Sequence, residues 1–151
     1  MDCADRVSVP TLITYPSECS PPPVCNGTLT ATISLNYAAS NVAGAVAHLD
    51  YPEASVSIPG TGSVASVLAR VTNLTGVSGG LFQVNDTDSL VNVGEVSLGA
   101  PIPSGNLAKV VFDCAPGTPV PAASAFVCTP DVSDDGGLDV AATCSIAVQV
   151  P

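Results

Sequence analysis

The chain has 151 residues, a length that suits one domain, and its 13 acidic residues against three Lys and Arg give a formal net charge of −10. This acidity argues against nucleic acid or anionic lipid as a partner, because both are bound by clustered Lys and Arg. Only 11% of the residues are charged, which is too few for a disordered acidic chain.

The composition favours strands over helices. Hydrophobic residues make up 46% of the chain, yet only 4% is aromatic and no Trp is present, so most of the apolar content is Ala and Val. Val and Thr favour strands because branching at Cβ restricts χ1. The 14 Pro and 13 Gly are scattered and therefore separate many short elements. We predict an all-β fold.

Residues 1–27 are predicted to form a Pro-rich extended arm. The proline run at 21–23 fixes φ and removes backbone donors, which disfavours regular sheet. Cys19 and Cys25 flank this run, and the first expected disulfide closes a local loop between them. Cys3 then needs a distant partner, which would tie the arm to the rest of the chain.

The domain expected at 28–151 begins with alternating apolar and polar residues, as a half-buried strand requires. The segments predicted as strands are 29–35, 45–49, 55–58, 66–71, 81–85, 90–98, 107–114, 125–128 and 143–150. The fifth and sixth of these segments are expected to form a hairpin. About nine short strands at this spacing indicate a disulfide-stabilised β-sandwich with jelly-roll topology.

Cysteines at the C-terminal end allow two pairings. Cys128 and Cys144 would face each other across a hairpin whose midpoint is Gly136, inside a strong turn signal. Cys114 and Cys128 have their midpoint in the Pro-rich turn at 116–123, so both pairings stay open. If the two strands that carry a bonded pair of cysteines belong to opposite sheets, the disulfide would link the two sheets and would not lie within a hairpin.

The cysteine count also indicates the compartment. Six cysteines beside a single His favour disulfides over a metal site, and no C-x2-C pair is present for structural zinc. Disulfides imply an oxidising compartment, so we expect a secreted, extracellular or cell-surface protein. Residues 1–9 contain no apolar signal core, and we expect that a signal was removed before Met1. No apolar run approaches the roughly 20 residues of a membrane helix.

An acidic turn near the C-terminus has the first half of a calcium-loop pattern, with oxygen ligands at alternate positions around a glycine. The candidate Ca²⁺ ligands are Asp131, Ser133, Asp135 and Asp139. The acid expected at the twelfth position is replaced by Ala142, so a plain acidic turn is favoured over a calcium site. A second acidic turn at 85–88 has less of the pattern. Ca²⁺ is the only cofactor that the sequence suggests.

No group of residues supports catalysis, and no catalytic residue is assigned. His48 is the only histidine, and on a strand it would share a face with Asp50. Nucleophilic catalysis also needs a nucleophile and a group that orients the base. We therefore interpret His48 as a structural or exposed strand residue and the chain as a non-enzyme.

The aromatic residues offer little to a sugar. Carbohydrate-binding modules usually present planar aromatic platforms, and this chain has no Trp. Tyr37 and Tyr51 lie near predicted strand ends and are the candidate exposed aromatics. The three Phe lie in apolar strand patterns and are predicted to be core.

Four stretches, taken in order, resemble cohesins, the β-sandwich modules that receive dockerins in cellulosomes. They are an opening strand at 27–35, a strand and turn at 42–53, a glycine-led strand at 105–112 and a closing turn and strand at 133–150. The chain looks especially like cohesin-like domains of bacterial surface proteins outside cellulosomes, within a superfamily that includes carbohydrate-binding modules. The resemblance implies a nine-stranded jelly roll with no active site.

The leading hypothesis is a non-catalytic extracellular recognition or scaffold module. It would bind another protein, a dockerin-like module or a neighbouring surface protein, through a sheet face or an exposed edge. The second hypothesis is a self-assembling subunit of a surface fibre or layer, in which the arm adds a strand to a neighbouring copy. The third is a carbohydrate-binding module. None of the three involves nucleic acid or membrane insertion.

Overall fold

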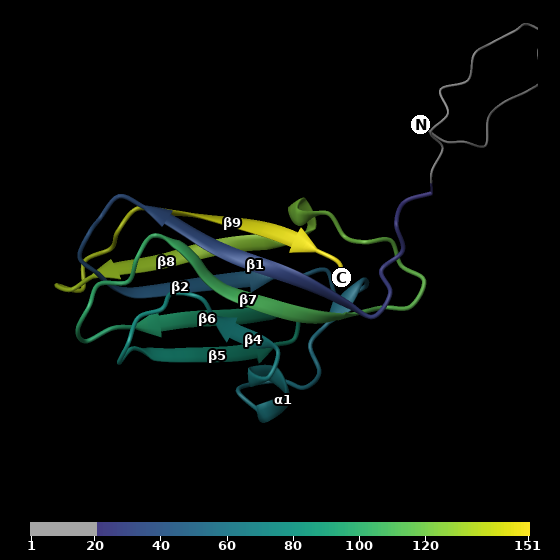
Figure 1. Ribbon diagram of the computed structural model, residues 1–151, viewed down its shortest axis with the longest axis horizontal. Coiled ribbons are helices and arrows are strands. Elements are labelled where there is room, and N and C mark those ends of the chain that lie inside the picture. The colour runs from purple at the N-terminus through teal and green to yellow at the C-terminus, as the bar shows by residue number, and fades with distance from the viewer. Residues whose placement is uncertain (1–20) are drawn as a thin grey trace, which may run out of the picture.

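The computed structural model of the chain describes residues 21–151. In these residues nine strands form two antiparallel sheets that pack face to face (Figure 1). The all-β sandwich predicted from the sequence is therefore confirmed. Cys3, Cys19 and most of the expected arm lie outside the described residues, so the boundary at residue 28 stays a prediction.

One sheet has five strands in the order β3-β7-β1-β9, with β4 also paired to β7. Their bounds are β1 Thr28–Tyr37, β3 Val56–Ser57, β4 Val71–Asn73, β7 Gly105–Cys114 and β9 Ala142–Gln149. The two short strands lie in line along one edge of β7, because β3 pairs with its last residues and β4 with its middle. Strand β1, which is as long as β7, is central and pairs with β7 and β9.

The other sheet has four strands in the order β5-β6-β2-β8. Their bounds are β2 Val42–Asp50, β5 Leu81–Thr87, β6 Leu90–Val96 and β8 Val127–Asp134. The predicted hairpin between β5 and β6 is confirmed, and Asp88 in its turn has a positive φ of 56°. Asp tolerates this left-handed conformation better than a β-branched residue does.

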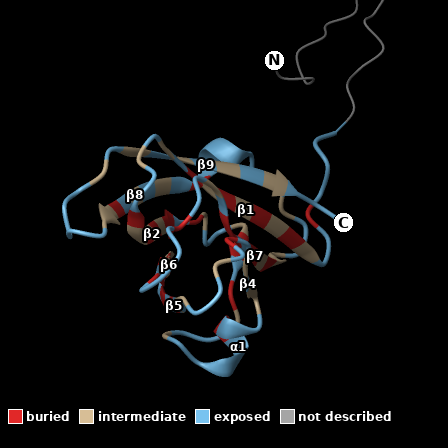
Figure 2. Ribbon diagram, turned by 60° about the vertical axis from the view of Figure 1, so that its left-hand side comes forward, coloured by how far each residue is buried: buried red, intermediate tan, exposed pale blue. Residues whose placement is uncertain are grey.

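The core lies between the two sheets and is built mainly from small apolar residues. In β1 the inward positions are fully buried while the outward positions are half-buried, which is the period-two pattern seen in the sequence (Figure 2). Three aromatic rings form a chain within this core: Tyr51 lies 5.0 Å from Phe112, and Phe112 lies 5.7 Å from Phe126, between ring centroids. The predicted core positions of Phe112 and Phe126 are confirmed, whereas Phe82 on β5 is only half-buried.

Two predicted strands were placed incorrectly. The segment 66–71 forms the short helix α1, Ala65–Leu68, followed by β4. Strands β3 and β4 both run antiparallel to β7, so the chain leaves the sheet after β3 and returns to it at β4. The segment between them contains a single helical turn, which buries Val67. The segment 125–128 ends the 3-10 turn η1, Ala123–Ala125, and begins β8, which continues through Pro130 because edge strands tolerate proline.

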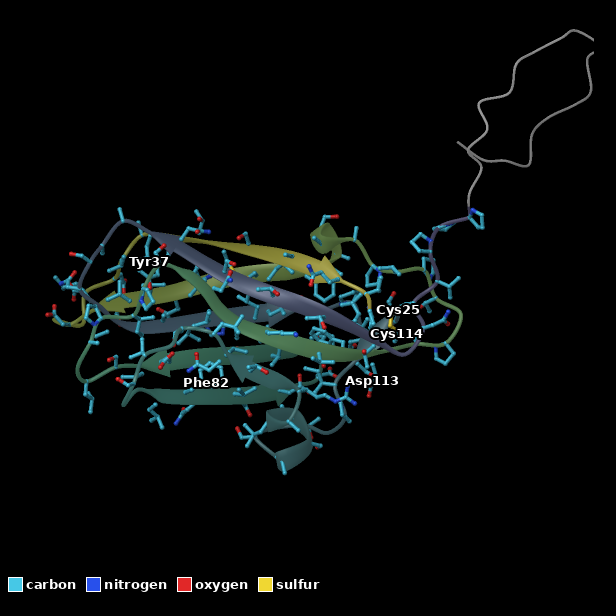
Figure 3. The ribbon with its side chains drawn as sticks, viewed as in Figure 1. Cys25, Tyr37, Phe82, Asp113 and Cys114 are labelled. Atoms are coloured by element: carbon cyan, nitrogen blue, oxygen red, sulfur yellow. A yellow bond between two sulfur atoms is a disulfide. The ribbon has the colours of Figure 1, made fainter. Side chains whose placement is uncertain are left out.

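Two disulfides stabilise the described residues. Cys25 bonds Cys114 at the end of β7 (Figure 3), so the expected pairing of Cys19 with Cys25 is wrong. That expectation used sequence proximity, but the fold brings Cys25 into the core beside a strand 89 positions later. Cys128 bonds Cys144, and because β8 and β9 belong to different sheets, this bridge clamps the sandwich.

No helix within residues 21–151 has the length and apolar character needed to span a membrane.

Candidate functional site

The outer face of the four-stranded sheet carries apolar side chains where the strand pattern calls for polar ones. Leu81 on β5 and Val96 on β6 are direct cross-strand partners, and they are 59% and 47% exposed. Exposed apolar residues that cluster in this way mark interaction surfaces more often than isolated ones do. We call Val46, Leu68, Leu81 and Val96 the apolar patch.

The apolar patch borders a shallow hollow of about 480 Å³ on this face. Gly94 keeps the hollow open, because a Cβ at that position would come within 2.9 Å of Val46 Cγ2. Leu68 reaches the rim from α1, which packs beside β5. The polar residues that line the hollow are Gln83, Asn85, Asn92 and Ser63, together with Glu95, which is buried. Apart from the buried Glu95, the hollow therefore combines apolar side chains with neutral hydrogen-bonding groups, as protein interfaces commonly do.

The apolar patch was not predicted from the sequence, although the sequence contains a signal for it. Phe82 and Val84 are the inward-facing residues of β5, so Leu81 is an apolar residue on the outward side of the alternation. The same holds for Val96 beside the buried Glu95. An apolar residue at an outward position of an alternating strand is the signal that would have indicated the apolar patch.

The remainder of the face is mostly polar, apart from the exposed Val127 on β8, and contains the single histidine. His48 Nδ1 lies 2.5 Å from Asn92 Oδ1, and on its other side His48 is paired with Thr129 of β8. Within residues 21–151, no carboxylate forms a hydrogen bond or ion pair with His48. Its neighbours are an amide and a threonine, which fit the interpretation of His48 as a structural strand residue.

Charge is distributed unevenly between the two sheets. Strands β2, β5, β6 and β8 contain no Lys or Arg, and their outer face carries Asp50 and Asp131. The two cations that the structure describes both belong to the other sheet. Lys109 lies on the outer side of β7, and Arg70, immediately before β4, forms a two-point ion pair with Asp113 of β7 at 2.7 and 3.0 Å. A partner at the apolar patch therefore meets neutral or negative groups.

Three acids gather around the Tyr51 hydroxyl at one end of the four-stranded sheet, Glu53, Asp86 and Asp88, and Asp50 lies near Glu53. Tyr51 donates to Asp86 Oδ1 at 3.1 Å and also contacts the Asp88 carbonyl. Burial, followed by the charge of Asp88, raises the pKa of Asp86, while the Tyr51 hydrogen bond acts in the opposite direction. Desolvation, a hydrogen bond with Asp88 and the nearby acids raise the pKa of Glu53.

The prediction that Tyr51 is exposed is wrong. Its side chain is 5% exposed, because the chain turns inward after β2 and places the ring against Phe112 while the hydroxyl reaches the acids. Burial and the nearby acid charges raise the pKa of this hydroxyl. Tyr37 is half-buried and donates to the Ile102 carbonyl at 2.9 Å, and burial raises its pKa. Neither ring forms a flat exposed platform of the kind that sugars stack on.

The candidate calcium ligands lie along β8 and the turn after it. Asp131 and Ser133 both point outward from β8, and Ser133 forms a bridge with Asp139. Asp135 accepts a hydrogen bond of 2.8 Å from the Asn41 amide, and Asp134 accepts two from turn amides. Within residues 21–151, no three acid, His or Cys side chains are grouped so that they could hold a metal ion. Both interpretations of this segment, the favoured plain acidic turn and the alternative calcium site, stay predictions.

A buried carboxylate joins the two sheets on the flank opposite the Cys128–Cys144 bridge. Glu95 points inward from β6 and is 1% exposed. Its Oε2 accepts a hydrogen bond of 3.1 Å from the Asn73 amide at the end of β4 and another from the Thr75 hydroxyl. Glu95 Oε1 has no hydrogen-bond partner within the described residues. This network fixes the loop between the sheets and was not predicted from the sequence.

Together the nine strands, their order and the closed core define a cohesin-like β-sandwich. The structure is similar to a solved structure described as a non-cellulosomal cohesin from the hyperthermophilic archaeon Archaeoglobus fulgidus. The match has a TM-score of 0.54 and 14% sequence identity, and it covers 78% of this chain and 75% of that one. The sequence matches no protein-family model and none of the curated proteins. The predicted cohesin-like fold is thus confirmed, while the bacterial surface type stays a prediction.

Proposed function

We propose that the chain is a non-catalytic protein-recognition module of cohesin type, and that its partner binds the outer face of the four-stranded sheet. The observation that carries this proposal is the apolar patch, where Leu81 and Val96 are about half exposed beside a hollow. Exposing apolar side chains costs solubility, so a cluster of them around a hollow is best explained by a partner that covers it.

The rigidity of the face also supports binding. Three of the four residues of the apolar patch lie on β5, β6 and β2, which pair without interruption over the patch. A partner would therefore meet a preformed surface and lose little free energy to ordering it. The only patch residue outside the sheet is Leu68 on α1.

The chemistry of the face limits the kind of partner. Without a cation on these four strands, an acidic partner surface would find no counter-charge. We therefore expect a protein surface with apolar residues at its centre and neutral or basic residues around them. The resemblance to cohesins suggests a dockerin-like module, and a neighbouring surface protein with the same chemistry fits equally well.

The proposed setting is extracellular. Both disulfides of the described residues require an oxidising compartment to form and persist. Mass spectrometry of the culture medium and of washed cells of the source organism tests this. Recovery of the oxidised chain only inside the cytoplasm would contradict it.

The binding proposal is tested by substitution on the two outer faces. The immobilised chain is incubated with secreted proteins of the source organism, and a captured protein is identified and its affinity measured. Leu81→Asp with Val96→Asp should weaken this affinity at least 100-fold, because two charges are placed in the centre of the contact, where single residues cost about 2 kcal/mol or more.

The matched control carries the same charges on the opposite face. Thr30→Asp with Thr32→Asp lies on β1, where both side chains point outward from the five-stranded sheet. This variant should bind as the unchanged chain does. If the control loses binding and the Leu81 and Val96 variant keeps it, the partner binds elsewhere and the proposed face is wrong.

A further inference from the structure

We propose that two copies of this chain associate through the free edge of β9, which pairs with β9 of the second copy in antiparallel fashion. This association uses a different surface from the apolar patch and does not depend on the proposed function. It is inferred from the pairing, the sequence and the burial of β9 compared with the other sheet edges.

Among residues 21–151, strand β9 pairs only with β1. It forms an uninterrupted register with β1 from Thr30↔Gln149 to Tyr37↔Ala142, without a bulge. On its other side, no backbone hydrogen bond reaches β9 from any residue in 21–151. Alternate residues of an antiparallel edge strand direct their N–H and C=O groups outward. Figure 1 shows β9 at the margin of its sheet, where η1 and β8 also contact it without forming a backbone hydrogen bond to it.

The other sheet edges have features that discourage pairing. Strand β8 contains Pro130 and Asp131, and proline and charge are common protections of an edge. The edge of β5 is partly occupied, because Gly62 bridges Asp86 and the Ser63 hydroxyl donates to the Val84 carbonyl. Strands β3 and β4 have two and three residues, which is too short to template another strand.

By contrast, β9 has eight residues, ATCSIAVQ, with no charge and no proline. The absence of charge matters in this chain, because a net charge of −10 makes two copies repel each other over most contacts. Two uncharged β9 edges can approach with the least repulsion. An antiparallel pairing of identical strands generates a two-fold axis, so the contact closes as a dimer and does not extend into a fibre.

The burial of β9 also indicates that its edge is incomplete. Ile146 and Val148 face the core, yet they are only half-buried, whereas their partners on β1, Ile33 and Ala31, are fully buried. In Figure 2, β9 alternates between tan and pale blue along its length. A second strand beside β9 would cover the open sides of Ile146 and Val148 while satisfying the outward backbone groups.

The test measures the mass of the full chain by sedimentation between about 1 µM and 1 mM, the range expected for weak association. The mass should rise toward that of two chains. Ser145→Lys with Ala147→Lys should raise the dissociation constant at least tenfold, because like charges then face each other across the pairing.

A matched control places the same charges one strand away. Ser34→Lys with Thr32→Lys occupies the positions on β1 that pair with Ser145 and Ala147, on the same outer face. This variant should dimerise as the unchanged chain does. Melting temperatures verify that both variants fold, and hydrogen exchange of residues 142–149 should slow as the concentration of the unchanged chain rises.

Three results would overturn the proposal. The first is a monomer mass over the whole concentration range. The second is a dimer that the β9 charges leave intact. The third concerns the apolar residues of the N-terminal sequence TLIT at 11–14. If Ile13→Lys removes the dimer, or removes a protection of β9 that does not depend on concentration, the N-terminal segment is the occupant of this edge.

Discussion

The outer face of the five-stranded sheet is covered by hydroxyls and charges, whereas the outer face of the four-stranded sheet exposes Leu and Val. On β1 the outward residues include Thr30, Thr32 and Ser34, and they are flanked by Lys109. On β5 and β6 the corresponding outward positions hold Leu81 and Val96. The same two-residue period thus produces a solvated surface on one sheet and a surface suited to a partner on the other.

The two sheets differ in the same way in their electrostatics. The five-stranded sheet holds both described cations, and one of them is paired with Asp113. The four-stranded sheet holds a buried carboxylate, Glu95, and an acidic end where the pKa values of Glu53 and Asp86 are raised. The five-stranded sheet is therefore closer to charge balance. The four-stranded sheet carries a net negative charge, which protonation or a bound partner would reduce.

The largest expected effect is on the five-stranded sheet. Cys25→Ser with Cys114→Ser should lower the free energy of unfolding by about 4 to 5 kcal/mol, because this disulfide closes a long loop in the unfolded chain. Cys128→Ser with Cys144→Ser should cost about 3 kcal/mol, since its loop is much shorter. Urea unfolding of both variants gives the two values. The reverse order would show that the Cys128–Cys144 disulfide between the sheets contributes more to the free energy of unfolding than the Cys25–Cys114 disulfide does.

The second effect concerns the buried acid of the four-stranded sheet. Glu95→Ala should lower the free energy of unfolding by about 2 to 3 kcal/mol, because the Asn73 amide and the Thr75 hydroxyl lose a charged acceptor. Glu95→Gln retains an acceptor oxygen and should cost less. Thermal unfolding measures both variants. A Glu95→Ala variant more stable than the unchanged chain would mean that desolvation of the charge outweighs its hydrogen bonds.

The third effect is a dependence on pH that follows from the acidic end. A carboxyl whose pKa is higher in the folded chain than in the unfolded chain destabilises the fold when ionised. The free energy of unfolding should therefore rise as pH falls from 7 toward about 4, where the unfolded carboxyls begin to take up protons. Melting curves across this range test the direction.

Two matched Asp→Asn substitutions test whether the pH dependence of stability comes from the acids around Tyr51. Asp88→Asn removes an acid that raises the pKa of both Glu53 and Asp86, so the rise in stability should become smaller. Asp139→Asn, in the turn after β8, removes one charge elsewhere and should leave the rise nearly unchanged. Equal effects of the two substitutions would attribute the pH dependence to overall charge.

The smallest effect is expected from calcium. Millimolar CaCl₂ should shift the melting temperature no more than NaCl of the same ionic strength, because the candidate ligands are not gathered around one point. A saturable shift that Asp135→Asn removes would contradict this expectation. It would also mean that the four-stranded sheet, whose strands contain no Lys or Arg, has a specific Ca²⁺ site at its β8 edge.

Much of the fold could be predicted from the sequence because alternation is a local property. The positions of β1, β7 and the β5–β6 hairpin follow from apolar residues at every second position and from a turn-forming Asp. Alternation failed at 66–71, where one buried Val67 is compatible with either a strand or a helical turn. This segment forms a helical turn because the chain has to return to β7 at β4, and that requirement depends on the fold and not on the local sequence.

The site and the disulfides were harder to predict because they depend on topology. The pairing of Cys25 with Cys114 requires knowledge that the residues before β1 lie beside the end of β7. The burial of Tyr51 requires the position of Phe112 in the other sheet. Leu81 and Val96 could have been noticed as out-of-phase residues, but their contact across two strands follows only from the register.

Methyl NMR of the complex with the captured partner tests the proposed binding face most directly, because both faces report in one spectrum. The methyl resonances of Leu81, Val96 and Val46 should shift or broaden when the partner is added, while those of Thr30 and Thr32 stay unchanged. Shifts of the Thr30 and Thr32 methyls, with Leu81 and Val96 unaffected, would contradict binding at the four-stranded sheet.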